Sequence, residues 1–175
     1  MCKTAATPPK GAERNDGADF SRELASLAAM PERLAGFFAA IPEALWRTRP
    51  ASGFFSLAEH ACHLRDIEIE GYRARLERML AESCPALADI DGGALARARD
   101  YLRQDPRRAR DAFAAVRADL VSRLGVLSAA ERARGGELEG AGRITVAGLV
   151  AKMREHDGEH LAELAALRDE LARRG

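Results

Sequence analysis

Apolar residues recur along most of the chain at steps of three, four and seven, the spacing that gathers them on one face of an α-helix. The first such stripe runs from Phe20 to Leu45, and we place the start of its helix near Asp19. Pro31 lies inside the stripe. Because proline lacks a backbone N–H, we expect a kink or a restart there, with Pro31 in the first turn of the second piece.

Three further helices are predicted from capping residues that precede apolar stripes. Ser56 and Glu59 form a capping box at the start of a helix that we extend to about Ala81. Asp105 precedes a proline and caps the next long helix, and Thr145 caps a last one that reaches nearly to the end of the chain.

The connections between these helices show no alternation of apolar and polar residues of useful length, so we predict no strands. A short helix is expected over residues 94–102, and residues 133–143 form a glycine-rich loop. Residues 1–18 are predicted to be a flexible tail, and residues 19–175 a single domain. Four long helices with one long connection predict an all-α fold, a four-helix bundle.

Composition excludes several classes of partner. The chain carries 27 basic and 27 acidic residues, a formal net charge of zero that points to neither nucleic acid nor a membrane surface. No apolar run approaches the roughly 18 residues that span a bilayer, and the first residues lack the apolar stretch of a secretory signal. Three cysteines without CxxC spacing form no disulfide framework. We therefore expect a cytoplasmic protein.

Two of the four histidines, His156 and His160, lie four residues apart on the last predicted helix, within or beside its apolar stripe. A buried neutral imidazole needs partners for both ring nitrogens, and two neighbouring imidazolium ions would repel each other. A shared divalent metal ion meets both requirements. The alternative is a pair of hydrogen-bonded core histidines.

The other two histidines, His60 and His63, lie on the second predicted helix, which a bundle can bring against the last one. Periodicity does not choose cleanly between them, although it slightly favours His60, which shares a face with Leu64 and Ile67. Cys62 falls on a different face from His63 and is not expected to be a ligand.

Two stretches, "FSLAEHACHLRD" and "HDGEHL", resemble motifs of the DinB/YfiT-like proteins, a family of metal-binding four-helix bundles, and the resemblance covers about residues 20–171. Phe55 replaces the family's tryptophan, and the matching positions are Ser56, Glu59, His63, Leu64, Asp66, His156, Asp157, His160 and Leu161. The resemblance implies a long crossover connection in the bundle. It also implies a metal site formed by His63, His156 and His160, with His60 either packed beside the ligands or hydrogen-bonded to one of them.

Three histidines leave coordination positions of an ion open, as in catalytic rather than structural zinc sites. Zinc and nickel suit imidazole ligands best, and iron is a third option. Carboxylates commonly orient ligand histidines by hydrogen bonds, and Asp66, Asp157 and Glu59 are candidates for this role. For each of them the alternative is a solvated charge on a helix.

Relatives of this type include transferases and isomerases that use low-molecular-weight thiols such as bacillithiol or mycothiol. The resemblance therefore implies a metal-dependent thiol S-transferase or isomerase whose partners are a small-molecule thiol and an electrophile. A non-catalytic metal-binding or stress-associated protein of the same fold is the alternative. Many relatives are dimers, so a homodimer is expected.

Overall fold

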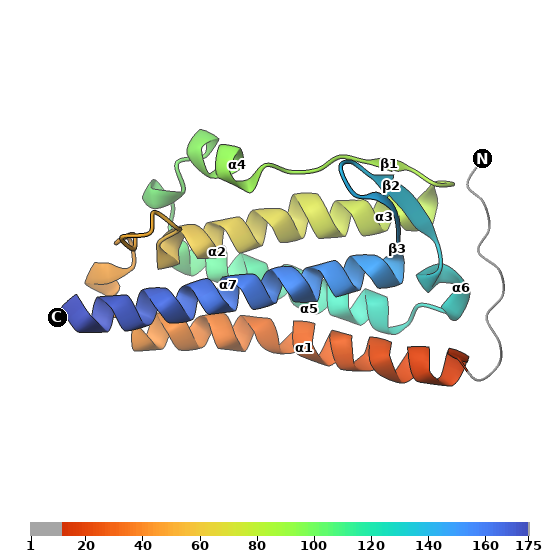
Figure 1. Ribbon diagram of the computed structural model, residues 1–175, viewed down its shortest axis with the longest axis horizontal. Helices are drawn as coiled ribbons and strands as arrows, with labels where there is room; N and C mark the ends of the chain where they lie inside the picture. The colour runs from red at the N-terminus through yellow and green to blue at the C-terminus, as the bar shows by residue number, and fades with distance from the viewer. Residues whose placement is uncertain (1–11, 175) are drawn as a thin grey trace.

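Four long helical rods lie side by side in the computed structural model, which describes residues 12–174 (Figure 1). The second rod is continuous but changes its winding, from the α-helix α2 to a π-helix, η2, and back to the α-helix α3. The bounds of the rods are Ala12–Ala40 for α1, Leu57–Asp66 for α2, Ile67–Arg73 for η2, Ala74–Ala81 for α3, Pro106–Gly125 for α5 and Val146–Arg174 for α7.

The directions of the rods follow from the lengths of their connections (Figure 1). α1 runs opposite to α2–α3, to which it is joined by a short connection. The segment 82–105 then crosses back along the bundle, so α5 runs parallel to α2–α3, and α7 returns in the opposite direction. α1 packs against α5 and α7, and α2 packs against α5. The expected four-helix bundle with a long crossover is confirmed.

The predicted helix starts on three of the rods are confirmed by their caps. The hydroxyl of Ser56 accepts from the backbone N–H of Glu59, whose carboxylate accepts from the Ser56 N–H at 3.0 Å. The carboxylate of Asp105 accepts from two backbone N–H groups of the first turn of α5. Thr145 Oγ1 accepts from the N–H of Gly148 at 3.0 Å. These interactions satisfy donors that a helix start leaves unpaired.

α1 begins before the predicted start at Asp19, and it does not restart at Pro31, which was one of the two outcomes expected there. It begins at Ala12, so residues 12–18 of the predicted tail are helical, and residues 1–11 lie outside the described part of the chain. It also continues through Pro31, which lacks the N–H that would bond to the carbonyl of Leu27. Arg117 Nη1 donates to that carbonyl at 3.2 Å instead. A partner from another helix thus offsets the loss.

Three short strands replace loops that the sequence predicted. They are β1 (Ala86–Leu87), β2 (Gly135–Leu138) and β3 (Gly142–Thr145), with β1 parallel and β3 antiparallel to β2. The strands are too short to show alternation, and glycine is required at their contacts. A Cβ on Gly136 would lie 2.7 Å from the carbonyl oxygen of Pro85. The sheet ties the crossover segment to the start of α7.

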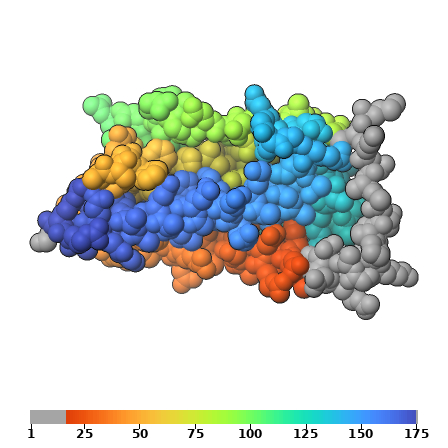
Figure 2. All heavy atoms as spheres, in the orientation of Figure 1, coloured from red at the N-terminus to blue at the C-terminus, as the bar shows by residue number. Residues whose placement is uncertain are grey.

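The crossover segment covers the outer side of α2 (Figures 1 and 2). It contains α4 (Gly92–Ala98) and the 3₁₀-helix η3 (Tyr101–Arg103), where one helix over residues 94–102 was predicted. Asp100, with a left-handed backbone at φ 46°, separates the two. α2 is therefore enclosed by the bundle on one side and the crossover on the other, and all its residues except Arg65 are buried.

Two further short helices lie in connections: the 3₁₀-helix η1 (Glu43–Leu45) between α1 and α2, and α6 (Ala129–Arg132) between α5 and β2. In the described part of the chain, no helix combines the length and apolarity needed to cross a bilayer.

Candidate metal centre

Three histidines from α2 and α7 meet in the interior of the bundle. The Nε2 atom of His156 lies 3.2 Å from that of His63 and 3.0 Å from that of His160. His156 and His160 are one turn apart on α7, and His63 lies in the last turn of α2. Ligand atoms of the three rings all lie within 4.8 Å of one another.

The chemistry of this group fits a divalent cation. Burial, together with the neighbouring histidines, lowers the pKa of His63 to about 3 and that of His156 to about 2. The rings are therefore neutral at pH 7, and each neutral ring can offer one nitrogen lone pair to a cation. Nitrogens that share a zinc ion at 2.0–2.1 Å lie roughly 2.9–3.4 Å apart. The observed Nε2 separations of 3.0 and 3.2 Å match this spacing.

A cavity of about 360 Å³ adjoins the three histidines. η2 and α3 contribute Ile67, Tyr72 and Arg75 to its wall, and the crossover segment contributes residues 89–93 except Asp91. Among the described residues, the three-histidine group contains no fourth protein donor. An ion held by these rings would therefore keep positions open toward the cavity, the arrangement of catalytic zinc sites.

The cavity wall combines an apolar part with fixed polar groups. Arg75 donates to the carbonyl of Ala88 from Nη2 at 2.7 Å and from Nε at 3.2 Å, which fixes the crossover segment over the cavity. Burial raises the pKa of Tyr72, so its hydroxyl stays protonated at neutral pH and remains a hydrogen-bond donor.

The sequence pattern of the DinB superfamily matches residues 26–164. The chain belongs to the DinB superfamily. The fold of this DinB protein is similar to that of YfiT from Bacillus subtilis, described as a probable metal-dependent hydrolase with an unusual four-helix bundle topology. The TM-score is 0.79 at 20% identity, over 98% of this chain and 92% of that one. A comparison with curated proteins gives no match.

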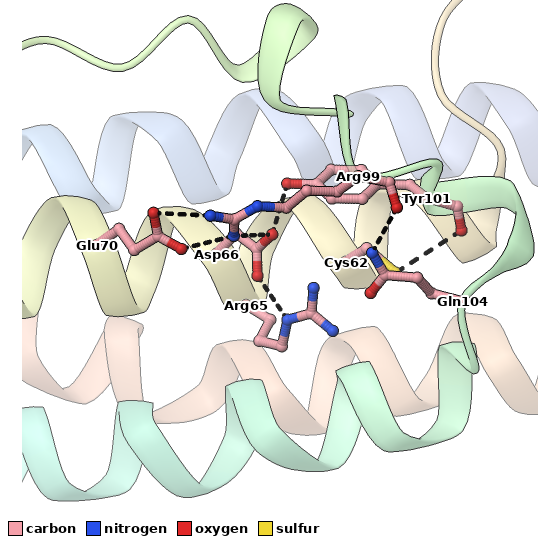
Figure 3. A network of polar contacts seen from close by, with 7 residues as sticks. All are labelled: Cys62, Arg65, Asp66, Glu70, Arg99, Tyr101 and Gln104. Carbon is pink, nitrogen blue, oxygen red and sulfur yellow. Dashed lines mark hydrogen bonds and ion pairs between the residues drawn. The ribbon is translucent and has the colours of Figure 1, made fainter. Parts of the chain in front are cut away.

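Asp66 of the DinB chain hydrogen-bonds groups of the crossover segment (Figure 3). The ring of His63 is not its partner, because Nδ1 of that ring has no hydrogen-bond partner and Nε2 lies beside His156. Its buried carboxylate accepts from Tyr101 Oη at 2.8 Å, from Arg99 Nη1 at 2.7 Å and from Arg65 Nε at 2.6 Å. Arg99 also contacts Glu70. Asp66 therefore attaches the crossover to α2 one turn beyond His63.

Asp157 forms its hydrogen bonds with Arg117, and not with a histidine of the candidate site. Its carboxylate accepts from Arg117 at 2.5 and 3.0 Å, and the same guanidinium binds Glu68 at 2.6 and 2.8 Å. All three side chains are buried. This group, with the Leu27 carbonyl, joins α1, η2, α5 and α7 beside the histidines. The sequence analysis missed Arg117, although its position four residues after Phe113 and three before Leu120 places it on the apolar face of its helix.

Glu59 is engaged at the start of α2, where it completes the capping box and accepts from Arg49 Nε at 2.9 Å. The carboxylate that does contact a ligand ring is Glu163, whose Oε2 lies 3.1 Å from His160 Nδ1. The sequence analysis missed Glu163. Its position three residues after His160 on the same helix was a usable signal, because such residues are neighbours on a helix surface.

His60 is fully buried beside the centre and is not part of the three-histidine group. Its ring packs edge-on against Phe55 and His160, with centroids 5.7 and 5.1 Å apart. Neither of its ring nitrogens has a hydrogen-bond partner. Periodicity slightly favoured His60 as the third ligand, and His60 is indeed fully buried. His63 is also buried, however, and its Nε2 atom is the one that lies beside a histidine nitrogen of α7.

Proposed function

We propose that His63, His156 and His160 hold a divalent cation, and that this DinB-superfamily protein is a thiol-dependent S-transferase or isomerase. The observation that carries the proposal is the position of three neutral imidazoles between the bundle core and an adjoining cavity of about 360 Å³. Zinc and nickel suit these ligands best, with iron as a third option.

His63, His156 and His160 would hold the cation, which would supply an open position where a thiol could ionise near neutral pH and remain a nucleophile. The three imidazoles are uncharged, so the cation would keep its full positive charge, which attracts an anionic sulfur. In the transfer step the sulfur forms a bond to an electrophilic carbon, and the leaving group departs with the electron pair of the broken bond. The thiol proton passes to solvent.

The chain's own residues would bind and orient the two reactants. Ile67 and Ile90 provide apolar contacts for the carbon skeleton of an electrophile. The hydroxyl of Tyr72, which stays protonated, can donate a hydrogen bond to the leaving group. The crossover segment, held by Arg75, forms one wall of the cavity in which the reactants would lie. Low-molecular-weight thiols are kept reduced in the cytoplasm, where we place the reaction.

Hydrolysis is the second candidate, because YfiT is described as a probable metal-dependent hydrolase and the same open position suits water. Arg75 and Asp89 make part of the cavity wall polar, and a polar wall suits hydrolysis better than a purely apolar one would. A non-catalytic metal-binding or stress-associated role is the remaining alternative. A fourth protein ligand that occupied the open coordination position of the metal would favour this non-catalytic role.

The test is to load purified, untagged protein with nickel or zinc and to titrate it with glutathione, bacillithiol and mycothiol. We expect thiol-to-metal charge-transfer bands with nickel, and conjugate formation when an alkyl halide or epoxide is added. His160→Ala should lose metal retention and transfer together, whereas Glu159→Gln, an exposed neighbour, should keep both.

Failure of every thiol to bind the fully metallated protein would overturn the transferase proposal. Cleavage of esters or amides by the loaded protein without any thiol would establish the hydrolase instead. Metal retention with neither activity would leave the non-catalytic role.

A further inference from the structure

A second group of donors adjoins the three-histidine group, on the other side of the His160 ring. His60 has no exposed surface, and both its ring nitrogens lack a hydrogen-bond partner. A buried imidazole with two unpaired nitrogens is costly, so such a ring calls for a ligand. The three-histidine centre does not use it.

The carboxylate of Glu163 lies between His60 and His160. Its Oε2 is 3.1 Å from His160 Nδ1 and 3.7 Å from His60 Nε2. The longer separation exceeds a hydrogen bond, but both are close to the roughly 3.3 Å that separates two ligands of a tetrahedral zinc ion. Donor atoms of His60, His160 and Glu163 all lie within 4.8 Å of one another.

We infer that His60, His160 and Glu163 form a second zinc site, which shares His160 with the three-histidine centre. The two nitrogens of the His160 ring point in opposite directions, Nε2 toward His156 and Nδ1 toward Glu163. Two imidazole nitrogens and one carboxylate are a common donor set for zinc. The second site stands whether the first one carries out thiol transfer or hydrolysis.

Occupancy of both sites makes His160 a bridge. To bind zinc there, His160 would give up its Nδ1 proton to solvent, and its ring would then be an imidazolate shared by the two ions. The anionic bridge and the Glu163 carboxylate together offset the charge of the second ion. The side chain of Glu163 is 28% exposed, so an ion reaches the site past this residue.

The experiment is zinc analysis of full-length protein that has been stripped with a chelator, reloaded with zinc chloride and dialysed. We expect two zinc ions per chain in the wild type. Glu163→Gln keeps a hydrogen-bond acceptor for His160 but removes the anionic ligand, so it should retain one ion. Glu159→Gln removes a charge one turn away on the exposed face of α7 and should retain two.

Two further variants separate the sites. His63→Ala removes a ligand of the first site only and should retain one ion. His60→Phe keeps an aromatic ring in the same space and should also retain one. Should His60→Phe fail to fold, Glu163→Gln and its control still decide the question.

Cobalt provides a second readout, because two Co²⁺ ions joined by an imidazolate are magnetically coupled. The wild type should show a coupled electron paramagnetic resonance signal, and Glu163→Gln an uncoupled one. A wild type that saturates at one zinc ion, or a Glu163→Gln variant that still binds two, would overturn the second site. Either result leaves the thiol-binding test of the first site unaffected.

Discussion

Gly92, in the first turn of α4, lies directly against the ring of His63. A Cβ at this position would be 2.9 Å from His63 Nδ1 and closer still to Cε1. The crossover segment therefore touches a candidate ligand, and its backbone limits where that ring can lie.

Replacement of Gly92 by alanine should weaken metal binding. The added methyl group must displace the His63 ring, and we expect zinc affinity to fall about 10–100-fold, as when a group that orients a ligand is lost. Chelator competition measures this. Gly93→Ala is the matched control, because its Cβ would meet only side-chain atoms of Asp91 and Arg97 at 3.3 and 3.4 Å. Equal affinities for the two variants would contradict the prediction.

Asp66→Asn should loosen the crossover segment. The change weakens the contacts to Arg99 and Tyr101 and leaves buried donors poorly paired, at a cost of about 1–3 kcal/mol. Amide hydrogen exchange over residues 92–104 should accelerate more than elsewhere in the chain. Glu70→Gln serves as control, since this half-exposed residue binds the same Arg99 and should cost under about 1 kcal/mol. Uniform acceleration across the bundle would argue against a local role.

Arg117→Met should be among the most destabilising single changes in the described chain. It leaves the carboxylates of Glu68 and Asp157 buried without a cation and the Leu27 carbonyl without a donor. The free energy of unfolding, measured with urea, should fall by about 3–5 kcal/mol. Arg123→Met, on the exposed side of the same helix, should cost no more than about 1 kcal/mol. A small loss for Arg117→Met would show that the carboxylates find other partners.

The metal-free protein should lose stability as the pH falls below about 6.5. The pKa of His63 is about 3 and that of His156 about 2 in the folded state, so the unfolded chain binds more protons in this range. Each ring then contributes about 1.4 kcal/mol per pH unit to the loss. Urea unfolding at pH 7.5, 6 and 5 tests this. His156→Gln should reduce the slope by one such increment, and an unchanged slope would contradict the assignment.

Local chemistry in the sequence determined where three of the rods begin. The capping box of Ser56 and Glu59, the carboxylate of Asp105 and the hydroxyl of Thr145 each bond to N–H groups within the first turn that follows. The spacing of His156 and His160 likewise fixes their relation to each other, because one helical turn places them on the same side. These interactions need no partner from elsewhere in the chain.

The tertiary structure decided which residues from other segments lie beside these helix starts and beside His156 and His160. His60 and His63 are both buried, because the bundle covers one side of α2 and the crossover covers the other, so burial could not choose between them. The helix continues through Pro31, and Arg117, 90 residues from Leu27 in the sequence, donates to the Leu27 carbonyl that the proline leaves without a backbone donor. Glycine-rich residues 135–145 form strands because they pair with each other and with residues 86–87. Each outcome depends on surfaces that meet only in the folded chain, which a local pattern does not encode.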